Sequence, residues 1–263
     1  MKKLLNLFDF KQKVDYKTEI LSGLTVALAL VPEAIAFALI PGFSPLTGLY
    51  AAFVLALITS IFGGRPGMIS GATGAVAVIF IGLILELKRN FPGITPETIL
   101  NYVFATVIIA GVLQILAGVL RLGKFIRLVP HPVMFGFVNG LAIIIFMAQF
   151  PNFYIKDSTD LLPWPSFFIM LGLTIVTMAI IWGLPKLTKA VPSTLVAIVI
   201  VSALVIGFNI DTLTVAGIMK DGQTIKGGFP PLSIPNIPLT FESFKIIFPF
   251  AAIVAGVGLI ESL

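Results

Sequence analysis

The chain has 263 residues, of which 58% are hydrophobic and only 11% charged, and its mean hydropathy is +1.08. A soluble domain carries about 25% charged residues, so this composition predicts an integral membrane protein, and its net charge of +5 reflects topology-setting loop residues rather than nucleic-acid binding. The absence of cysteine and the single histidine exclude a disulfide, a cysteine nucleophile and an all-histidine metal cluster, and we expect no cofactor.

Apolar runs divide the chain into predicted spans. Residues 1–17 form a short cytoplasmic segment, 18–208 a first repeat of seven spans, 209–242 an outer loop, and 243–263 the start of an eighth span. The seven predicted spans cover residues 20–40, 46–62, 73–87, 98–120, 132–150, 165–183 and 193–208. We expect Pro32 to break the first span. Any strands within 213–229 would form a short hairpin around Asp221-Gly222.

The third run is too short to cross the membrane. From Thr73 to Leu87 a helix rises only about 21 Å at 1.5 Å per residue, against about 30 Å of hydrocarbon. Ser70 and Thr73 are good N-caps, and a half-helix that begins inside the membrane offers an anion its free N–H groups and positive dipole end. The alternative is an ordinary membrane helix that starts at a different residue, in which Gly71 and Gly74 allow close packing against neighbouring helices.

Three carboxylates fall within the predicted spans. Glu86 lies beside two basic residues near a helix end and is interfacial, whereas Glu33 and Glu261 lie deeper. An intramembrane carboxylate indicates a functional site, and burial favours its protonated form. The alternative is a neutral glutamic acid that hydrogen-bonds a neighbouring helix. Phe37 follows Glu33 by four residues, on the same helix face.

The first and last runs share a pattern. Residues 25–33 and 251–261 are each a small or apolar run that meets one glutamate well inside a span. Seven spans followed by a run that is similar to the first span favour an inverted repeat, of which this sequence contains only the beginning of the second copy. Chance similarity between two apolar helices is the alternative. Because the last run stops at Leu263 without a polar flank, we expect the protein to continue beyond this sequence.

Five motifs, in order along the chain, resemble the sulfate permease (SulP) family of anion transporters. They are Pro32-Glu33-Ala34-Ile35-Ala36-Phe37-Ala38, Gly48-Leu49-Tyr50-Ala51-Ala52-Phe53, Ile69-Ser70-Gly71-Ala72-Thr73-Gly74, His131-Pro132-Val133-Met134-Phe135-Gly136-Phe137 and Gly258-Leu259-Ile260-Glu261-Ser262-Leu263. The resemblance implies a 7+7 inverted repeat with a core and a gate domain, in which anions bind between the N-termini of half-helices on the third and tenth spans. This chain lacks the tenth span, the rest of the second repeat and the family's C-terminal STAS domain.

The same resemblance assigns roles to individual residues. Glu33, Phe37 and Thr73 would line the anion site, and Glu261 would stand at the cation-coupling position. Ser70 and Gly74, at the predicted helix start, complete the predicted substrate site.

We therefore predict an all-α membrane protein comprising the first repeat, its third span a half-helix, and the start of the eighth span of a 7+7 inverted-repeat transporter. Its predicted function is secondary active transport of a small oxyanion of the sulfate, bicarbonate or dicarboxylate class by alternating access, although these residues hold only half of the anion site. The alternatives are a nucleobase permease of the same fold and an uncoupled anion channel. An intramembrane enzyme is disfavoured because no catalytic pair lies at depth.

The expected setting is the cell (inner) membrane, which the protein crosses several times in contact with lipid. A proton or sodium ion would be coupled to the anion, and the full-length protein would form a homodimer. With a cytoplasmic N-terminus, 11 of the 17 lysines and arginines fall on the inner side and 6 on the outer side. This split agrees with the positive-inside rule.

Cysteine labelling tests this orientation, because the chain has no cysteine of its own. Single cysteines replacing Asn90 and Asp157 should react with an impermeant thiol reagent added to intact cells, whereas cysteines replacing Arg65 and Lys124 should not. Labelling at 124 without labelling at 157 would reverse the orientation.

Overall fold

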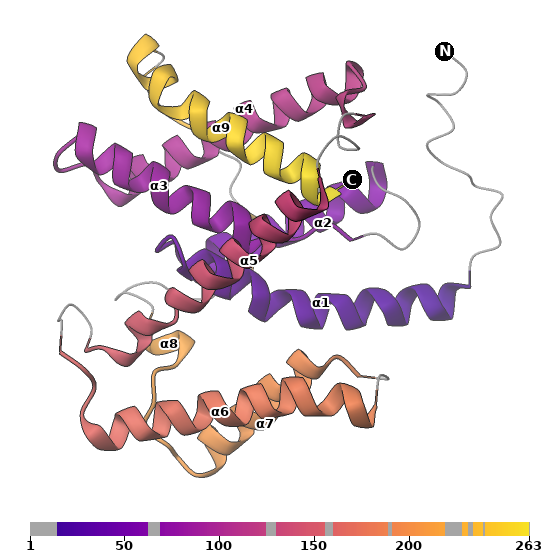
Figure 1. The fold of residues 1–263 in the computed structure, drawn as a ribbon, viewed down its shortest axis with the longest axis vertical. Coiled ribbons are helices and arrows are strands. Elements are labelled where there is room, and N and C mark those ends of the chain that lie inside the picture. The colour runs from indigo at the N-terminus through magenta and orange to yellow at the C-terminus, as the bar shows by residue number, and fades with distance from the viewer. Residues whose placement is uncertain are drawn as a thin grey trace. The chain divides into compact units, whose positions relative to one another are not determined.

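Apolar α-helices joined by loops make up the structure, and the described part of the chain contains no strand (Figure 1). The computed structural model describes residues 15–62, 69–124, 130–155, 160–188, 191–218, 228–230, 234–238 and 240–262. An all-α fold is therefore confirmed, and the helices follow the predicted spans closely. The long helices are α1 (Tyr16–Leu39), α2 (Pro45–Phe62), α3 (Gly74–Asn90), α4 (Pro96–Val119), α5 (His131–Met147), α6 (Trp164–Leu187), α7 (Ser193–Gly207) and α9 (Phe241–Ser262).

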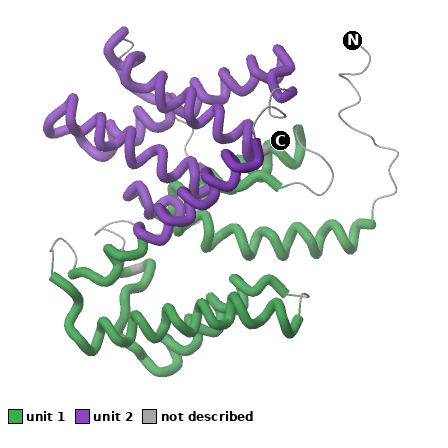
Figure 2. Tube along the Cα trace, viewed as in Figure 1, with its two compact units in different colours: residues 1–36, 44–72, 149–226 green, residues 37–43, 73–148, 227–263 purple. Residues whose placement is uncertain are grey.

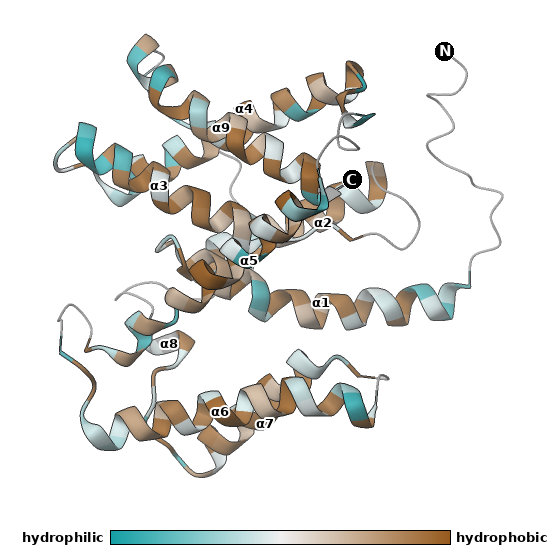
Figure 3. Cartoon of the chain, viewed as in Figure 1, coloured by the Kyte–Doolittle hydropathy of each residue, from teal (hydrophilic) through white to brown (hydrophobic). Residues whose placement is uncertain are grey.

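Six of these segments are long and apolar enough to cross a membrane: α1, α2, α4, α5 with the short 3₁₀ helix η2 (Phe150–Phe153) that follows it, α6 and α9. Apolar residues cover much of their surface, as hydrocarbon requires (Figure 3). The other two long helices are too short to cross the membrane: α7 has 15 residues and α3 has 17. At 1.5 Å per residue these helices are about 22 and 25 Å long, short of the about 30 Å of hydrocarbon.

The chain divides into two compact units (Figure 2). Unit 1 comprises residues 1–36, 44–72 and 149–226, and unit 2 comprises residues 37–43, 73–148 and 227–263. Within unit 1, α6 and α7 pack against each other. Within unit 2, α9 packs on both α3 and α4, and α3 also contacts α5.

In unit 1, the first helix starts at a charged cap. Asp15 accepts hydrogen bonds from the Lys17 backbone N–H at 3.2 Å and from Thr18 Oγ1 at 2.6 Å. The hydrogen bond from the Thr18 side chain, above all, lowers the pKa of the Asp15 carboxyl from its usual value. An ionised cap at this point satisfies free N–H groups at the start of α1 before the helix becomes apolar.

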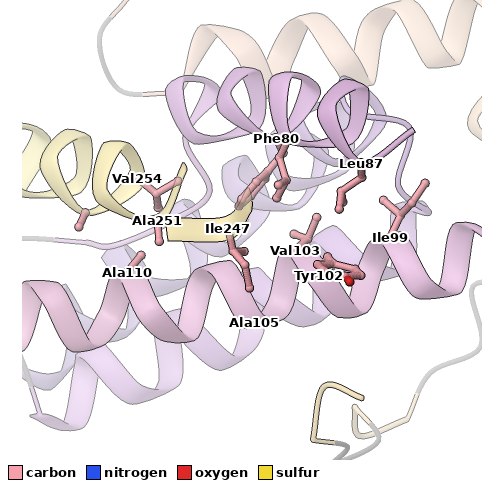
Figure 4. Close-up of a cluster of buried hydrophobic side chains, with 12 residues drawn as sticks. Phe80, Leu87, Ile99, Tyr102, Val103, Ala105, Ala110, Ile247, Ala251 and Val254 are labelled. Atoms are coloured by element: carbon pink, nitrogen blue, oxygen red, sulfur yellow. The ribbon is translucent and has the colours of Figure 1, made fainter. Parts of the chain in front are cut away.

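In unit 2, a buried apolar cluster joins α3, α4 and α9 (Figure 4). Leu83 and Leu87 of α3 and Ala251 of α9 have no exposed surface. The cluster consists of Phe80, Leu83, Leu87, Ile99, Tyr102, Val103, Ala105, Ala110, Ile247, Ala251, Val254 and Ala255. Small alanines on α4 and α9 let the two backbones approach closely, as is typical of helix packing in membranes.

Two interhelical hydrogen bonds fix the direction of α9 relative to α4. The Tyr102 hydroxyl lies 3.2 Å from Ser243 Oγ, and Gln114 Nε2 donates to the Ala255 carbonyl at 3.5 Å. The two residues of each pair are 141 positions apart in the sequence. Because this separation is the same at both contacts, α4 and α9 run parallel, with the same residue offset along their length. Two parallel helices that cross a membrane must have an odd number of crossings between them, and the three spans predicted at residues 132–150, 165–183 and 193–208 would meet this requirement.

One local prediction was wrong, and one predicted span ended too early. α1 runs unbroken through Pro32, because the loss of one backbone hydrogen bond is tolerated in a long membrane helix. Val215–Ile218 forms the short helix α8 within the predicted outer loop, and Asp221-Gly222, the centre of any hairpin there, lies outside the described residues. The third helix begins where expected but continues three residues past Leu87, to Asn90.

The buried cluster predicts unequal costs for two neighbouring truncations. Leu83→Ala should lower the free energy of unfolding by about 2 kcal/mol, the low end of the range for a buried leucine, because lipid is as apolar as the leucine side chain and mainly the cavity cost remains. Leu85→Ala, on the same helix but 63% exposed, should change it little. Thermal unfolding in detergent measures both, and equal shifts would contradict the packing of α3 on α4 and α9.

Candidate functional site

The N-terminus of α3 is capped by a threonine. Thr73 has an extended backbone (φ −123°, ψ 141°), and its Oγ1 accepts a hydrogen bond from the Val76 N–H at 3.4 Å. The Thr73 carbonyl accepts the first backbone bond of the helix, from Ala77 N at 3.2 Å. An α-helix provides no internal acceptor for the N–H groups of its first residues, here Gly74 and Ala75. These two N–H groups and the Thr73 hydroxyl proton are therefore the donors at this helix end.

Two apolar side chains lie close to the first residue of α3. A Cβ built on Gly74 would lie 3.0 Å from Phe37 Cε1 and 2.8 Å from Ile145 Cδ1 of α5. Because Gly74 has no side chain, both neighbouring side chains can approach this closely, and the role of Gly74 in substrate binding stays a prediction. Phe37, Thr73 and Gly74 were predicted together, and unit 2 brings them together. Ile145 was missed, because nothing in the uniformly apolar sequence of α5 distinguishes it.

Glu33 and Ser70, the other two residues predicted to bind substrate, belong to unit 1. Glu33 is exposed and lies one helical turn before Phe37 on α1, and Ser70 is half-buried in the extended segment before α3. A Cβ on Gly71 would lie 2.6 Å from Leu30 Cδ1, so this extended segment passes close to α1. The roles of Glu33 and Ser70 stay predictions.

Glu261, the predicted coupling residue, lies in the last turn of α9 and is exposed in this chain. Its helix is held in place earlier, by the core residues from Ile247 to Ala255. A Cβ on Gly258 would collide with Gln114 Nε2, so α4 closely approaches α9 one turn before Glu261. The coupling role of Glu261 is untested by these contacts.

A polar cavity of about 400 Å³ lies at the opposite end of α3, where the helix ends beside the start of α9. Its charged and amide groups belong to Glu86, Asn90, Glu242 and Lys245, and the Asn90 amide donates to Glu86 Oε1 at 2.9 Å. Because α3 ends where α9 starts, these two helices are antiparallel. The interfacial position of Glu86 stays a prediction.

No group of three or more histidine, cysteine, aspartate or glutamate side chains that could hold a metal ion occurs among the residues the structure describes. The donors at the start of α3 are hydroxyl and backbone N–H groups, which suit an anion rather than a metal cation.

Comparison with known proteins gives consistent results. The Sulfate permease family model matches residues 16–263. The chain is 41% identical over 260 residues to the putative sulfate transporter YbaR of Bacillus subtilis, covering 98% of this chain and 49% of that protein. It is 33% identical to the bicarbonate transporter BicA of Picosynechococcus, covering 93% of this chain and 44% of that protein. The chain thus spans about half the length of these relatives.

A solved structure, the transmembrane domain of a cyanobacterial bicarbonate transporter BicA, matches with a TM-score of 0.76 at 26% identity. The match covers 95% of this chain and 64% of the solved chain. It confirms the predicted fold class, the first part of an inverted-repeat transporter domain.

Proposed function

The chain belongs to the sulfate permease family, and from this membership we propose that it forms the first half of a secondary active transporter for small oxyanions. The observation that carries the proposal is the capped N-terminus of α3, with donors from Thr73, Gly74 and Ala75 at a single helix end. Relatives described as sulfate and bicarbonate transporters support an anion as the cargo.

Binding would use the backbone more than charged side chains. The N–H groups of Gly74 and Ala75 and the hydroxyl of Thr73 would donate to the oxygens of the anion, and the dipole of α3 would favour its negative charge. The edge of the Phe37 ring, which carries partial positive charge, lies at the same helix end.

The missing half of the site would come from the second repeat, through the matching half-helix on the tenth span. Rocking of a core domain against a gate domain would then expose the anion alternately to each side of the membrane. We place the N-terminus in the cytoplasm and the protein in the cell membrane as a homodimer, and the labelling experiment above tests this orientation.

Coupling would reside at Glu261. Lys245 and Glu261 are 16 residues apart, which is about 24 Å along a helix. If Lys245 marks the outer surface, Glu261 lies beyond the midplane yet within about 30 Å of hydrocarbon. A carboxylate at that depth needs a proton, a cation or a basic partner, so a proton or sodium ion bound there would accompany the anion.

The anion site predicts a loss of affinity on Thr73→Val in the full-length protein. Valine keeps the shape but removes one donor, so sulfate or bicarbonate binding should weaken by about 0.5–1.5 kcal/mol, and by more if a buried partner is stranded. That is about 2- to 12-fold in Kd. Thr73→Ser should retain binding. Isothermal titration of detergent-solubilised protein measures the Kd.

A matched control is Thr95→Val, because Thr95 caps α4 in the same way, accepting from Thr98 N at 3.3 Å. It should cost similar helix stability and leave anion affinity unchanged. Unchanged affinity in Thr73→Val would reject Thr73 as a ligand contact.

The coupling site predicts a separate phenotype for Glu261→Gln in the full-length protein. Glutamine resembles the protonated acid and cannot release a proton, so the variant should fold and bind anion but lose pH-driven uptake. Reconstituted vesicles with an imposed pH gradient provide the measurement. Glu242→Gln, exposed at the start of the same helix, is the control and should transport normally. Undiminished accumulation by Glu261→Gln would make Glu261 structural only.

A further inference from the structure

The side chain of Ile145 comes from α5 to the start of α3. Its Cδ1 would lie 2.8 Å from a Cβ on Gly74, closer than either atom of the Phe37 ring at 3.0 and 3.4 Å. All three residues belong to unit 2. Ile145 is half-buried, whereas its neighbours Ile143 and Ile144 are 60% and 42% exposed. Ile145 thus differs from the neighbouring isoleucines of α5 because its side chain lies against the start of α3.

The direction of this contact matters. Every Cα–Cβ bond of an α-helix points outward from the axis and is tilted toward the N-terminus, so the Cβ direction at Gly74 leans toward the end that presents the free N–H groups. Ile145 and Phe37 therefore lie beside the first turn of α3, next to the N–H groups that an anion would approach. Neither side chain can donate a hydrogen bond, and Ile145, which is aliphatic, acts on an anion only by occupying space.

From this geometry we propose that Ile145 is a wall of the anion site and sets the size of the anion that fits there. The inference rests on the proposed function. An oxygen that accepts from Gly74 N–H at about 2.9 Å must fit beside the Ile145 terminal methyl group. A flat, small anion such as bicarbonate needs less of this space than tetrahedral sulfate does. Removing the methyl group should therefore favour the larger anion.

Ile145→Val is the sharpest test, because it removes only Cδ1, the atom that lies against Gly74. One methylene in an apolar pocket changes discrimination by about 10- to 200-fold, and we expect at least about 5-fold in a half-exposed site. The sulfate-to-bicarbonate uptake ratio of the full-length protein in vesicles should rise by this factor in Ile145→Val and fall in Ile145→Phe. Ile143→Val, the same change two residues away on an exposed face, should leave the ratio unchanged.

A second measurement does not depend on transport rates. In full-length protein without other cysteines, Ile145→Cys should react with a charged thiol reagent, and sulfate should slow the reaction. Chloride at equal ionic strength should slow it less, and the reaction of Ile143→Cys should not respond to sulfate.

The outcomes separate the two proposals. A parent protein that takes up neither anion and shows no protection would refute the proposed function. A parent that transports, with the uptake ratio unchanged in Ile145→Val and no protection of Ile145→Cys, would leave the function standing and overturn the role of Ile145. A merely structural Ile145 would change uptake of both anions equally and leave their ratio constant.

Discussion

We propose that α3 begins inside hydrocarbon, where a helix must find partners for its first N–H groups, and this requirement accounts for the arrangement around its start. Thr73 satisfies one of these groups through its hydroxyl oxygen. In the proposed site the N–H groups of Gly74 and Ala75 would bind the ligand, and the absence of a side chain on Gly74 lets Phe37 and Ile145 approach this helix end closely. Backbone geometry that would be costly without a ligand would then form a selective anion receptor when one is bound.

Such a receptor works only if its helix is held rigidly, and unit 2 provides this support. The buried cluster fixes the middle and far end of α3 against α4 and α9, and Val76 in the first turn of α3 also packs against it. α9 would begin the second repeat, so the first half-helix packs directly on the element that would lead to its counterpart. Glu261, the proposed coupling residue, and the proposed anion receptor are thus carried on helices that share one core, through which occupancy at one site would affect the other.

The sequence predicts much of this arrangement because membrane-spanning segments can be recognised from their apolar composition. Hydropathy places the spans, and the threonine before a short apolar run identifies the cap of α3, since both depend on local chemistry. Pro32 misleads, because tertiary and lipid surroundings tolerate a proline that would break a helix in water. Ile145 could not be predicted from the sequence for a different reason. The role proposed for it depends on a contact with Gly74, 71 residues away, and α5 is apolar throughout.

Helix direction links the fold to the mechanism. α3 and α9 run antiparallel, whereas α4 and α9 run parallel. A first repeat with the seven predicted spans would have an odd number of crossings, so a second copy would start on the opposite side of the membrane. A half-helix in that copy would then point its N-terminus toward that of α3 from the other side. In the proposed mechanism, two opposed dipoles meeting near the midplane would hold an anion equally well from either side, which is the symmetry that alternating access requires.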